Sequence, residues 1–275
     1  MSELDFQQLL DWGRTHARWL VISGAGCSTE VGIPDYRDAD GQWKRPQPVT
    51  YQAFMGDELV RQRYWARSML GWRVMGQARP GAAHGALALL EQQGRIELLL
   101  TQNVDGLHSA AGSRQVLDLH GRIDTVRCMD CGQRHARAEL QQRLLARNPE
   151  WAGLYAAAAP DGDADLEHRD FSGFEVPACP QCSSGLLKPD VVFFGESVPR
   201  ERVQAGLDAV ARCDGVLIAG SSLMVYSGFR FAEAAARQGK SLVAINRGRT
   251  RADPLLDFKQ ASDVGQALAE LARLV

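Results

Sequence analysis

A buried strand that runs into a glycine-rich turn is the feature that most restricts the fold of this chain. The apolar run Trp19–Ser23 is followed by GAGCSTEVGIPDYR, residues 24–37. Gly24 and Gly26 allow a sharp turn and a close approach of phosphate to the backbone, whose N–H groups bind anions at a helix start. Thr29 replaces the third glycine of the GxGxxG pattern, so the glycines alone fit an ordinary strand–helix turn as well as a cofactor loop.

The end of this stretch favours the cofactor loop. Gly32 and Pro34 predict a second turn. Asp35 and Arg37 then place two charges beside the expected phosphate site, and an arginine can bind a phosphate through two N–H donors. We therefore predict that residues 24–37 bind a phosphate-containing cofactor.

Alternating strands and helices predict a parallel, doubly wound sheet. The expected strands are residues 19–23, 96–100, 116–119, 191–194, 215–219 and 242–246, and the expected helices are residues 6–14, 84–93, 200–212, 229–238 and 264–274. Ligands of such sheets bind at the carboxyl ends of strands. Polar or glycine clusters fall at four such ends: Gly24, Gln102–Asp105, Gly220–Ser222 and Asn246–Gly248.

Two C-x-x-C pairs predict a metal site inside a smaller module. Cys128, Cys131, Cys179 and Cys182 can supply four thiolates to a tetrahedral structural zinc. A redox C-x-x-C is the alternative, but two pairs in one module favour the metal. His135 is expected at the surface. No catalytic role is assigned to Cys27 or Cys213.

The predicted fold class is α/β, a doubly wound parallel Rossmann-like sheet with a smaller zinc-binding module and a helical lid inserted. Residues 1–50, 81–120 and 189–275 are assigned to the Rossmann-like domain. Residues 51–80 have helical spacing with many aromatic side chains and form the lid, and residues 121–188 form the zinc module.

Charge and hydropathy exclude two classes of function. The 31 basic and 33 acidic residues nearly balance, which argues against a broad nucleic-acid surface. No apolar run approaches the length that spans a membrane. The acidic N-terminus resembles neither a signal peptide nor a transit peptide, so we expect a soluble cytoplasmic protein.

His120 is the candidate general base. It follows a short strand and lies between the Gln102–Asp105 cluster and the zinc module, where a pocket is expected. An imidazole titrates near neutral pH and so suits proton transfer there. An ordinary histidine in a turn is the alternative. His84, His108 and His168 are expected to be structural or solvated.

The motifs together resemble the sirtuin family, in order along nearly the whole chain. They are GAGCSTEVGIPDYR (24–37), TQNVDGLH (101–108), LHG (119–121), the C-x-x-C pairs, KPDVVFFGE (188–196) and GSSLMV (220–225). Tyr36, YWAR (64–67), APDGD (159–163) and VYSG (225–228) resemble class II, which includes a mitochondrial vertebrate sirtuin. The composition fits a bacterial member.

The resemblance implies a protein-lysine deacylase that consumes NAD as a co-substrate, transfers the acyl group to ADP-ribose and releases nicotinamide. It implies that the acyl-lysine oxygen attacks the ribose, that His120 is the general base, and that Asn103 contributes to catalysis. Asp105 is implied to bind the nicotinamide amide. The implied NAD-binding set is Gly24, Ala25, Gly26, Asp35, Tyr36, Arg37, Gln102, Asn103, Asp105, Gly220, Ser221, Ser222, Asn246, Arg247, Gly248 and Val264.

The resemblance also implies an acyl-peptide site formed by strand addition. Its expected residues are Val192, Phe193, Phe194, Gly195, Val225 and Tyr226. Tyr64 and Arg67 lie one helical turn apart and resemble a pair that binds an acyl carboxylate. An alignment that places Ser68 and Gly71 there, and a lid-core role for Tyr64, are equally open. The loop at residues 156–172 is a hypothesis for the acyl channel.

Competing functions remain at this point. Protein mono-ADP-ribosyl transfer uses the same pocket, and a zinc-dependent binding module that senses NAD is a third possibility. A redox role is the poorest fit, because the third glycine is missing. The expected partners are acyl-lysine proteins or peptides, without nucleic acid or membrane. The preferred acyl group, the protein targets and the oligomeric state are open.

Overall fold

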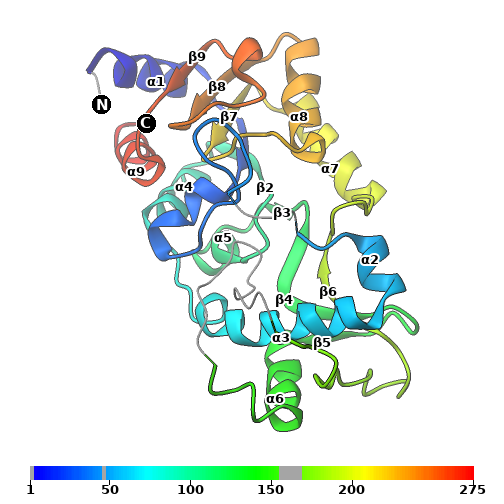
Figure 1. Cartoon of the computed structure of the whole chain (residues 1–275). Coiled ribbons are helices and arrows are strands. Elements are labelled where there is room, and N and C mark those ends of the chain that lie inside the picture. The colour runs from blue at the N-terminus through cyan, green and yellow to red at the C-terminus, as the bar shows by residue number, and fades with distance from the viewer. Residues whose placement is uncertain (1–2, 45–47, 155–168) are drawn as a thin grey trace.

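A six-stranded parallel sheet forms the larger part of the molecule (Figure 1). The computed structural model describes residues 3–44, 48–154 and 169–275. The strand order is β3-β2-β1-β7-β8-β9, so the order reverses between β1 and β7, and the carboxyl edge beside such a reversal is where ligands bind. The strands are β1 Trp19–Ser23, β2 Ile96–Thr101, β3 Val116–Asp118, β7 Gly215–Ala219, β8 Ser241–Ile245 and β9 Phe258–Gln260.

Helices cover both faces because the side chains of each strand alternate. In β1, Trp19 and Val21 belong to one apolar cluster, and Leu20 and Ile22 to another on the opposite face. Helices α1 (Glu3–Thr15), α4 (Ala82–Gln92) and α9 (Val264–Leu274) cover the first face. Helices α7 (Arg200–Arg212) and α8 (Tyr226–Arg237) cover the second face. No helix of the described part of the chain is long and apolar enough to cross a membrane.

In the described part of the chain, a three-stranded antiparallel sheet and three helices form the smaller part (lower half of Figure 1). Its apolar core includes Phe54, Trp65 and Phe174, each nearly inaccessible to solvent. The strands, in sheet order, are β5 Arg134–Ala136, β4 Gly121–Cys128 and β6 Leu187–Val191. The helices are α2 Tyr51–Gly56, α3 Glu58–Met75 and α6 Arg137–Arg147, and a short helix, α5 Leu107–Ala110, follows β2.

The predicted fold class, a doubly wound parallel sheet with a smaller inserted module, is confirmed, and helices α7 and α9 have the predicted bounds. The division into residue ranges stays a prediction. One local prediction is wrong. The strand expected at 191–194 lies instead at Leu187–Val191 and pairs with β4 in the small sheet. The turn after β1 leads into two 3₁₀ turns, Ala25–Cys27 and Thr29–Val31.

Two further differences have simple causes. The helical stretch of the lid is two helices, because Asp57 leaves the helical conformation and caps α3 by accepting the N–H groups of Leu59 and Val60. The edge strand β9 was not predicted. Its residues Phe258–Gln260 include a single apolar side chain, which is too little for a periodic signal.

Candidate functional site

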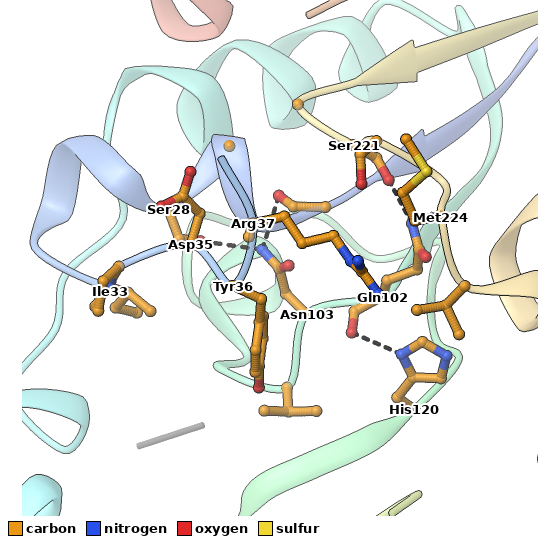
Figure 2. A pocket seen from close by; sticks show the side chains of 18 of the residues that line it. Ser28, Ile33, Asp35, Tyr36, Arg37, Gln102, Asn103, His120, Ser221 and Met224 are labelled. Atoms are coloured by element: carbon orange, nitrogen blue, oxygen red, sulfur yellow. Dashed lines mark hydrogen bonds between the residues drawn. The ribbon is translucent and has the colours of Figure 1, made fainter. Parts of the chain in front are cut away.

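A cavity of about 780 Å³ opens at the carboxyl ends of β1, β2, β7 and β8 (Figure 2). Residues of the large sheet, of the 34–44 loop and of the β6–α7 connection line it. All the predicted NAD-binding residues contribute: Gly24, Ala25, Gly26, Asp35, Tyr36, Arg37, Gln102, Asn103, Asp105, Gly220, Ser221, Ser222, Asn246, Arg247, Gly248 and Val264. His120 lines the same cavity, as do Val192, Phe193, Phe194, Gly195, Val225 and Tyr64.

The glycine turn packs backbone against backbone. The Gly26 N–H donates to the Gly220 carbonyl oxygen at 2.8 Å, and a Cβ on Gly26 would lie 2.8 Å from the Gly220 Cα. Gly220 has φ of +58°, a conformation that glycine adopts without strain. A Cβ on Gly24 would lie 2.7 Å from the Ser221 Cβ. These contacts explain why glycine stands at positions 24, 26 and 220.

Polar side chains at the end of β2 form two hydrogen-bonded groups, one around Asn103 and Asp105 and one between Gln102 and Ser221. The Asn103 amide donates to the Gly24 carbonyl oxygen and to Ser28 Oγ, both at 3.1 Å. The Ser28 hydroxyl donates to Asp105 Oδ2 at 2.8 Å. Gln102 donates to Ser221 Oγ at 2.7 Å. Ser28 lines the cavity and was not predicted as a site residue, although it follows the glycine turn that sequence reasoning had already selected.

His120 is held at both ring nitrogens. Nδ1 lies 2.9 Å from the Gln102 carbonyl oxygen, shown as a dashed line in Figure 2, and Nε2 lies 2.8 Å from Ser227 Oγ. A carbonyl oxygen is an acceptor, so Nδ1 carries the hydrogen and Nε2 keeps the lone pair in the neutral ring. Burial, opposed by the hydrogen bond to Gln102 and assisted by the charge of Arg202, lowers the pKa of His120. Nε2 is therefore arranged to accept a proton.

The 34–44 loop encloses one side of the cavity. The Arg37 guanidinium lies 3.9 Å from the centre of the Trp43 ring, donates to the Gly41 carbonyl oxygen at 2.7 Å, and points into the cavity in Figure 2. Asp35 pairs with Lys44 at 2.5 Å. The Trp43 ring meets the Phe194 ring edge to face, with centroids 5.5 Å apart, which joins this loop to the predicted peptide segment.

Some of the residues predicted to bind the acyl group and the peptide line the cavity, and others do not. Tyr64 is buried and packs against Phe54 and Phe193 at the cavity wall. Arg67 is half-buried one turn further along α3, and it is not among the described residues that line the cavity. Tyr226 is 49% exposed and also lies outside the described lining. Residues 156–168 of the candidate acyl loop, which spans residues 156–172, lie outside the described residues.

The predicted metal ligands converge. The Sγ atoms of the four cysteines lie within 4.8 Å of one another, at 3.7 Å for Cys128 and Cys182 and 3.8 Å for Cys131 and Cys179. Zn–S bonds of about 2.3 Å place the sulfurs of a tetrahedral site about 3.8 Å apart, so the cluster fits zinc. His135, expected at the surface, is half-buried, and its Nε2 lies 3.5 Å from Cys179 Sγ.

The remaining cysteines and two of the remaining histidines are buried. Burial raises the pKa of Cys27 to about 12 and also raises that of Cys213, so neither is a ready nucleophile. His84 and His108 are nearly inaccessible, with ring centres 4.8 Å apart. His108 bonds to Ser23 at 2.8 Å, which fits the predicted structural role.

Comparison with known proteins decides the family. A model of the Sir2 family matches residues 24–227. This chain belongs to the Sir2 family. The resemblance to sirtuins is thereby confirmed, while the assignment to class II stays a prediction.

Bacterial members of the Sir2 family are similar over almost the whole chain. An NAD-dependent protein deacetylase of Xanthomonas campestris is 62% identical over 263 residues, which cover 96% of this chain and 89% of the relative. One from Bordetella bronchiseptica is 60% identical over 97% of both chains. These relatives agree with the expected bacterial origin.

Solved Sir2 structures share the fold. A Sir2 homologue in complex with NAD has a TM-score of 0.73 and 30% identity, covering 97% of this chain and 92% of the other. A Sir2 variant with a deacetylated p53 peptide and 3′-O-acetyl ADP-ribose has a TM-score of 0.75 and 30% identity, covering 98% of this chain and 97% of the other.

Proposed function

We propose that this Sir2-family chain is an NAD-dependent protein-lysine deacylase. It consumes NAD, releases nicotinamide and transfers the acyl group from lysine to ADP-ribose. The observation that most supports the proposal is the place of His120. Its Nε2 faces the same cavity as the glycine turn and the Asn103–Asp105 group. Relatives that cover nearly the whole chain are NAD-dependent protein deacetylases.

Different residues along the cavity bind different parts of NAD. Gly24 and Gly26, which have no side chain, let the pyrophosphate approach the backbone closely, and the hydroxyls of Ser221 and Ser222 hold the pyrophosphate and adenosine end. Arg37 adds charge toward the phosphates from its loop.

At the other end, the Asp105 carboxylate accepts the amide N–H of nicotinamide. The Ser28 hydroxyl and the Leu107 N–H already bond to that carboxylate and fix its direction. Asn103 is held beside it by its bonds to Gly24 and Ser28, and its amide oxygen can stabilise the positive charge that develops on the ribose as nicotinamide leaves.

His120 acts after the acyl oxygen has joined the ribose. A ribose hydroxyl takes the position of the Ser227 hydroxyl and transfers its proton to Nε2, and the resulting imidazolium is held by the Gln102 carbonyl oxygen at Nδ1. The deprotonated hydroxyl oxygen bonds to the former acyl carbon, and a water molecule adds to the same carbon. The bonds from this carbon to the lysine nitrogen and to the oxygen on the ribose anomeric carbon then break, and the imidazolium returns its proton to the leaving amine. The products are a free lysine and O-acyl-ADP-ribose.

The zinc site has a structural role in this proposal. Four cysteine ligands leave no open coordination position, so a zinc ion bound there stabilises the β4–β5–β6 module and takes no part in the chemistry.

The substrates are acyl-lysine proteins or peptides that lie along Val192–Gly195 and Val225–Tyr226. Tyr64 with Arg67 is the candidate pair for an acyl carboxylate.

A mass-spectrometric assay tests the function. The protein is incubated with NAD and one lysine peptide that carries acetyl, long-chain acyl or succinyl groups in turn, beside the His120→Ala variant. Loss of the acyl group with formation of O-acyl-ADP-ribose, absent in the variant, supports deacylation. Nicotinamide release with ADP-ribose attached to a protein and no acyl transfer would replace it with ADP-ribosyl transfer. A preference for succinyl over acetyl would support the Tyr64–Arg67 pair.

A further inference from the structure

An ion pair between the buried Lys188 and the half-buried Glu196 spans the segment that precedes α7, and the proposed reaction does not use it. Lys188 Nζ lies 3.1 Å from Glu196 Oε2, with side-chain exposures of 5% and 24%. The ammonium also lies 4.6 Å from the centre of the Phe193 ring. Taking charges out of water costs free energy even when they are paired, so such a pair is weak evidence for stability alone.

Both members of the pair also bind the backbone between them. Lys188 Nζ donates to the carbonyl oxygens of Pro189, at 3.2 Å, and Val191, at 2.5 Å. Glu196 Oε2 accepts the N–H of Phe193 at 2.9 Å. The ion pair therefore fixes the path of the chain from the end of β6 to Glu196.

This path is one wall of the cavity. Residues 191–196 all line it. The outer side of the segment is tied to α2, because the Tyr51 N–H donates to the Phe194 carbonyl oxygen at 2.8 Å and Gln52 donates to that of Gly195 at 3.0 Å. The Val192 N–H donates to the His120 carbonyl oxygen at 2.8 Å, so the segment also adjoins the general base.

We propose that Lys188 and Glu196 are positioning residues for the acyl-peptide. They hold Val192–Gly195 in the conformation that pairs with an extended peptide. The segment is therefore already ordered before the peptide binds, and less conformational entropy is lost on binding. This inference rests on the proposed function. It goes beyond it by assigning substrate recognition to two charged residues that need not touch the substrate. Burial lowers the pKa of Lys188 and the charge of Glu196 opposes this, which agrees with a desolvated ammonium held by its partner.

The residues proposed to bind NAD are separate from the ion pair, so effects on peptide binding and on NAD binding can be distinguished. The glycine turn, Gln102 and Asn103 hold the dinucleotide from the strand ends of the large sheet and do not contact the ion pair. A change at Lys188 or Glu196 should therefore act on the peptide and spare NAD. If the ion pair only stabilised the fold, a change at either residue would weaken the binding of both the peptide and NAD, or of neither.

Four variants test it: Lys188→Met, Glu196→Gln, the double variant, and Arg212→Gln as the control. Arg212 pairs with Glu97 at the start of β2, away from the cavity. Glu196→Gln keeps an acceptor for the Phe193 N–H and so is the variant that best preserves the fold.

We expect the KM for an acetyl-lysine peptide to rise about tenfold in each single variant, since removing one member of a desolvated pair leaves the other charge without its partner and costs more free energy than the pair contributes. The KM for NAD and kcat should stay within about twofold, and the double variant should be no worse than Lys188→Met.

Calorimetry of the same peptide separates this inference from the proposed function. Weaker peptide binding by Glu196→Gln, with unchanged NAD binding, supports the positioning role even when no turnover is found. Equal peptide binding by Glu196→Gln and the unaltered protein overturns it, and so does a parallel loss of NAD and peptide affinity. Failure of the proposed function alone would appear as peptide binding without any release of nicotinamide.

Discussion

His120 Nδ1 lies 2.9 Å from the carbonyl oxygen of Gln102, and this contact decides which ring nitrogen can act as a base. Because the carbonyl oxygen accepts the Nδ1 hydrogen, the lone pair of the neutral ring is on Nε2, which faces the cavity. Gln102 thus makes two contacts: its carbonyl oxygen orients the proposed base, and its side chain donates to Ser221, a residue of the predicted NAD-binding set. The end of β2 therefore connects the proposed base with the proposed dinucleotide site.

The first prediction concerns the two contacts of the imidazole. His120→Ala should lower kcat by about 10²-fold or more, the usual contribution of a positioned base. Ser227→Ala should lower it by no more than about tenfold, since a neutral hydrogen bond contributes about 1 kcal/mol. Single-turnover assays at saturating NAD and peptide measure both. An equal loss in the two variants would show that Ser227, and not His120 alone, takes part in proton transfer.

The second prediction is a pH dependence. Burial lowers the pKa of His120, and the positive charge of Arg202 acts in the same direction. The base must be neutral, so the acid limb of kcat/KM should lie below about 6.5, the ordinary histidine value. Arg202→Gln removes a charge that disfavours the imidazolium, so the limb should move to higher pH. Arg212→Gln, in the last turn of the same helix, should leave it unchanged, and a shift in both variants would contradict the assignment.

Much of the site was predictable because its residues follow buried strands. Apolar runs such as Trp19–Ser23 and Gly215–Ala219 are strong signals, and the polar residues that follow them must gather at one edge of a parallel sheet. The cysteine spacing was equally informative, since Cys128 and Cys131 bracket a tight turn. These features can be recognised from residue types and their spacing along the sequence, without knowledge of long-range contacts.

What sequence reasoning missed depends on pairing across the chain. The apolar run at 191–194 has no periodicity that distinguishes a strand of the large sheet from the end of one in the small sheet, and the pairing of β6 with β4 decides it. Ser28 and Ser227 are single hydroxyls, and each gains a role from a partner found 77 and 107 residues away respectively. Arg137 is fully buried although arginine is seldom a core residue.

The third prediction tests the close packing of the glycine turn. A Cβ on Gly26 would meet the backbone of Gly220, which cannot move without shifting β7. Gly26→Ala should lower the free energy of unfolding by about 1–3 kcal/mol, as overpacking does, and should weaken NAD binding. Gly56→Ala is the control, because a Cβ there meets nothing within 4 Å. Calorimetric titration with NAD compares the two. Unaltered affinity in Gly26→Ala would remove the turn from the dinucleotide site.

The fourth prediction concerns the zinc site. Elemental analysis should find about one zinc per chain, as four thiolates in this geometry require. Cys179→Ser should lose the metal and melt at a lower temperature, because metal binding contributes directly to folding free energy. Cys213→Ser removes a buried cysteine outside the cluster and should keep the zinc. A metal-free protein with an unchanged melting temperature would show that the thiolates have another role.

The last prediction follows from the buried histidine beneath the site. Burial, with the neighbouring His84, lowers the pKa of His108 to about 3. The unfolded chain binds a proton at this residue below about pH 6.5 and the folded chain does not. The free energy of unfolding should therefore fall by about 1.4 kcal/mol for each pH unit below 6.5 from this residue alone, until the folded protein also binds the proton. His108→Gln removes the titrating group, and its amide can still bond to Ser23. Urea unfolding at pH 7.5 and pH 5.5 should thus show a smaller acid destabilisation in the variant, whereas an identical pH dependence would mean that His108 is protonated in the folded protein at pH 5.5.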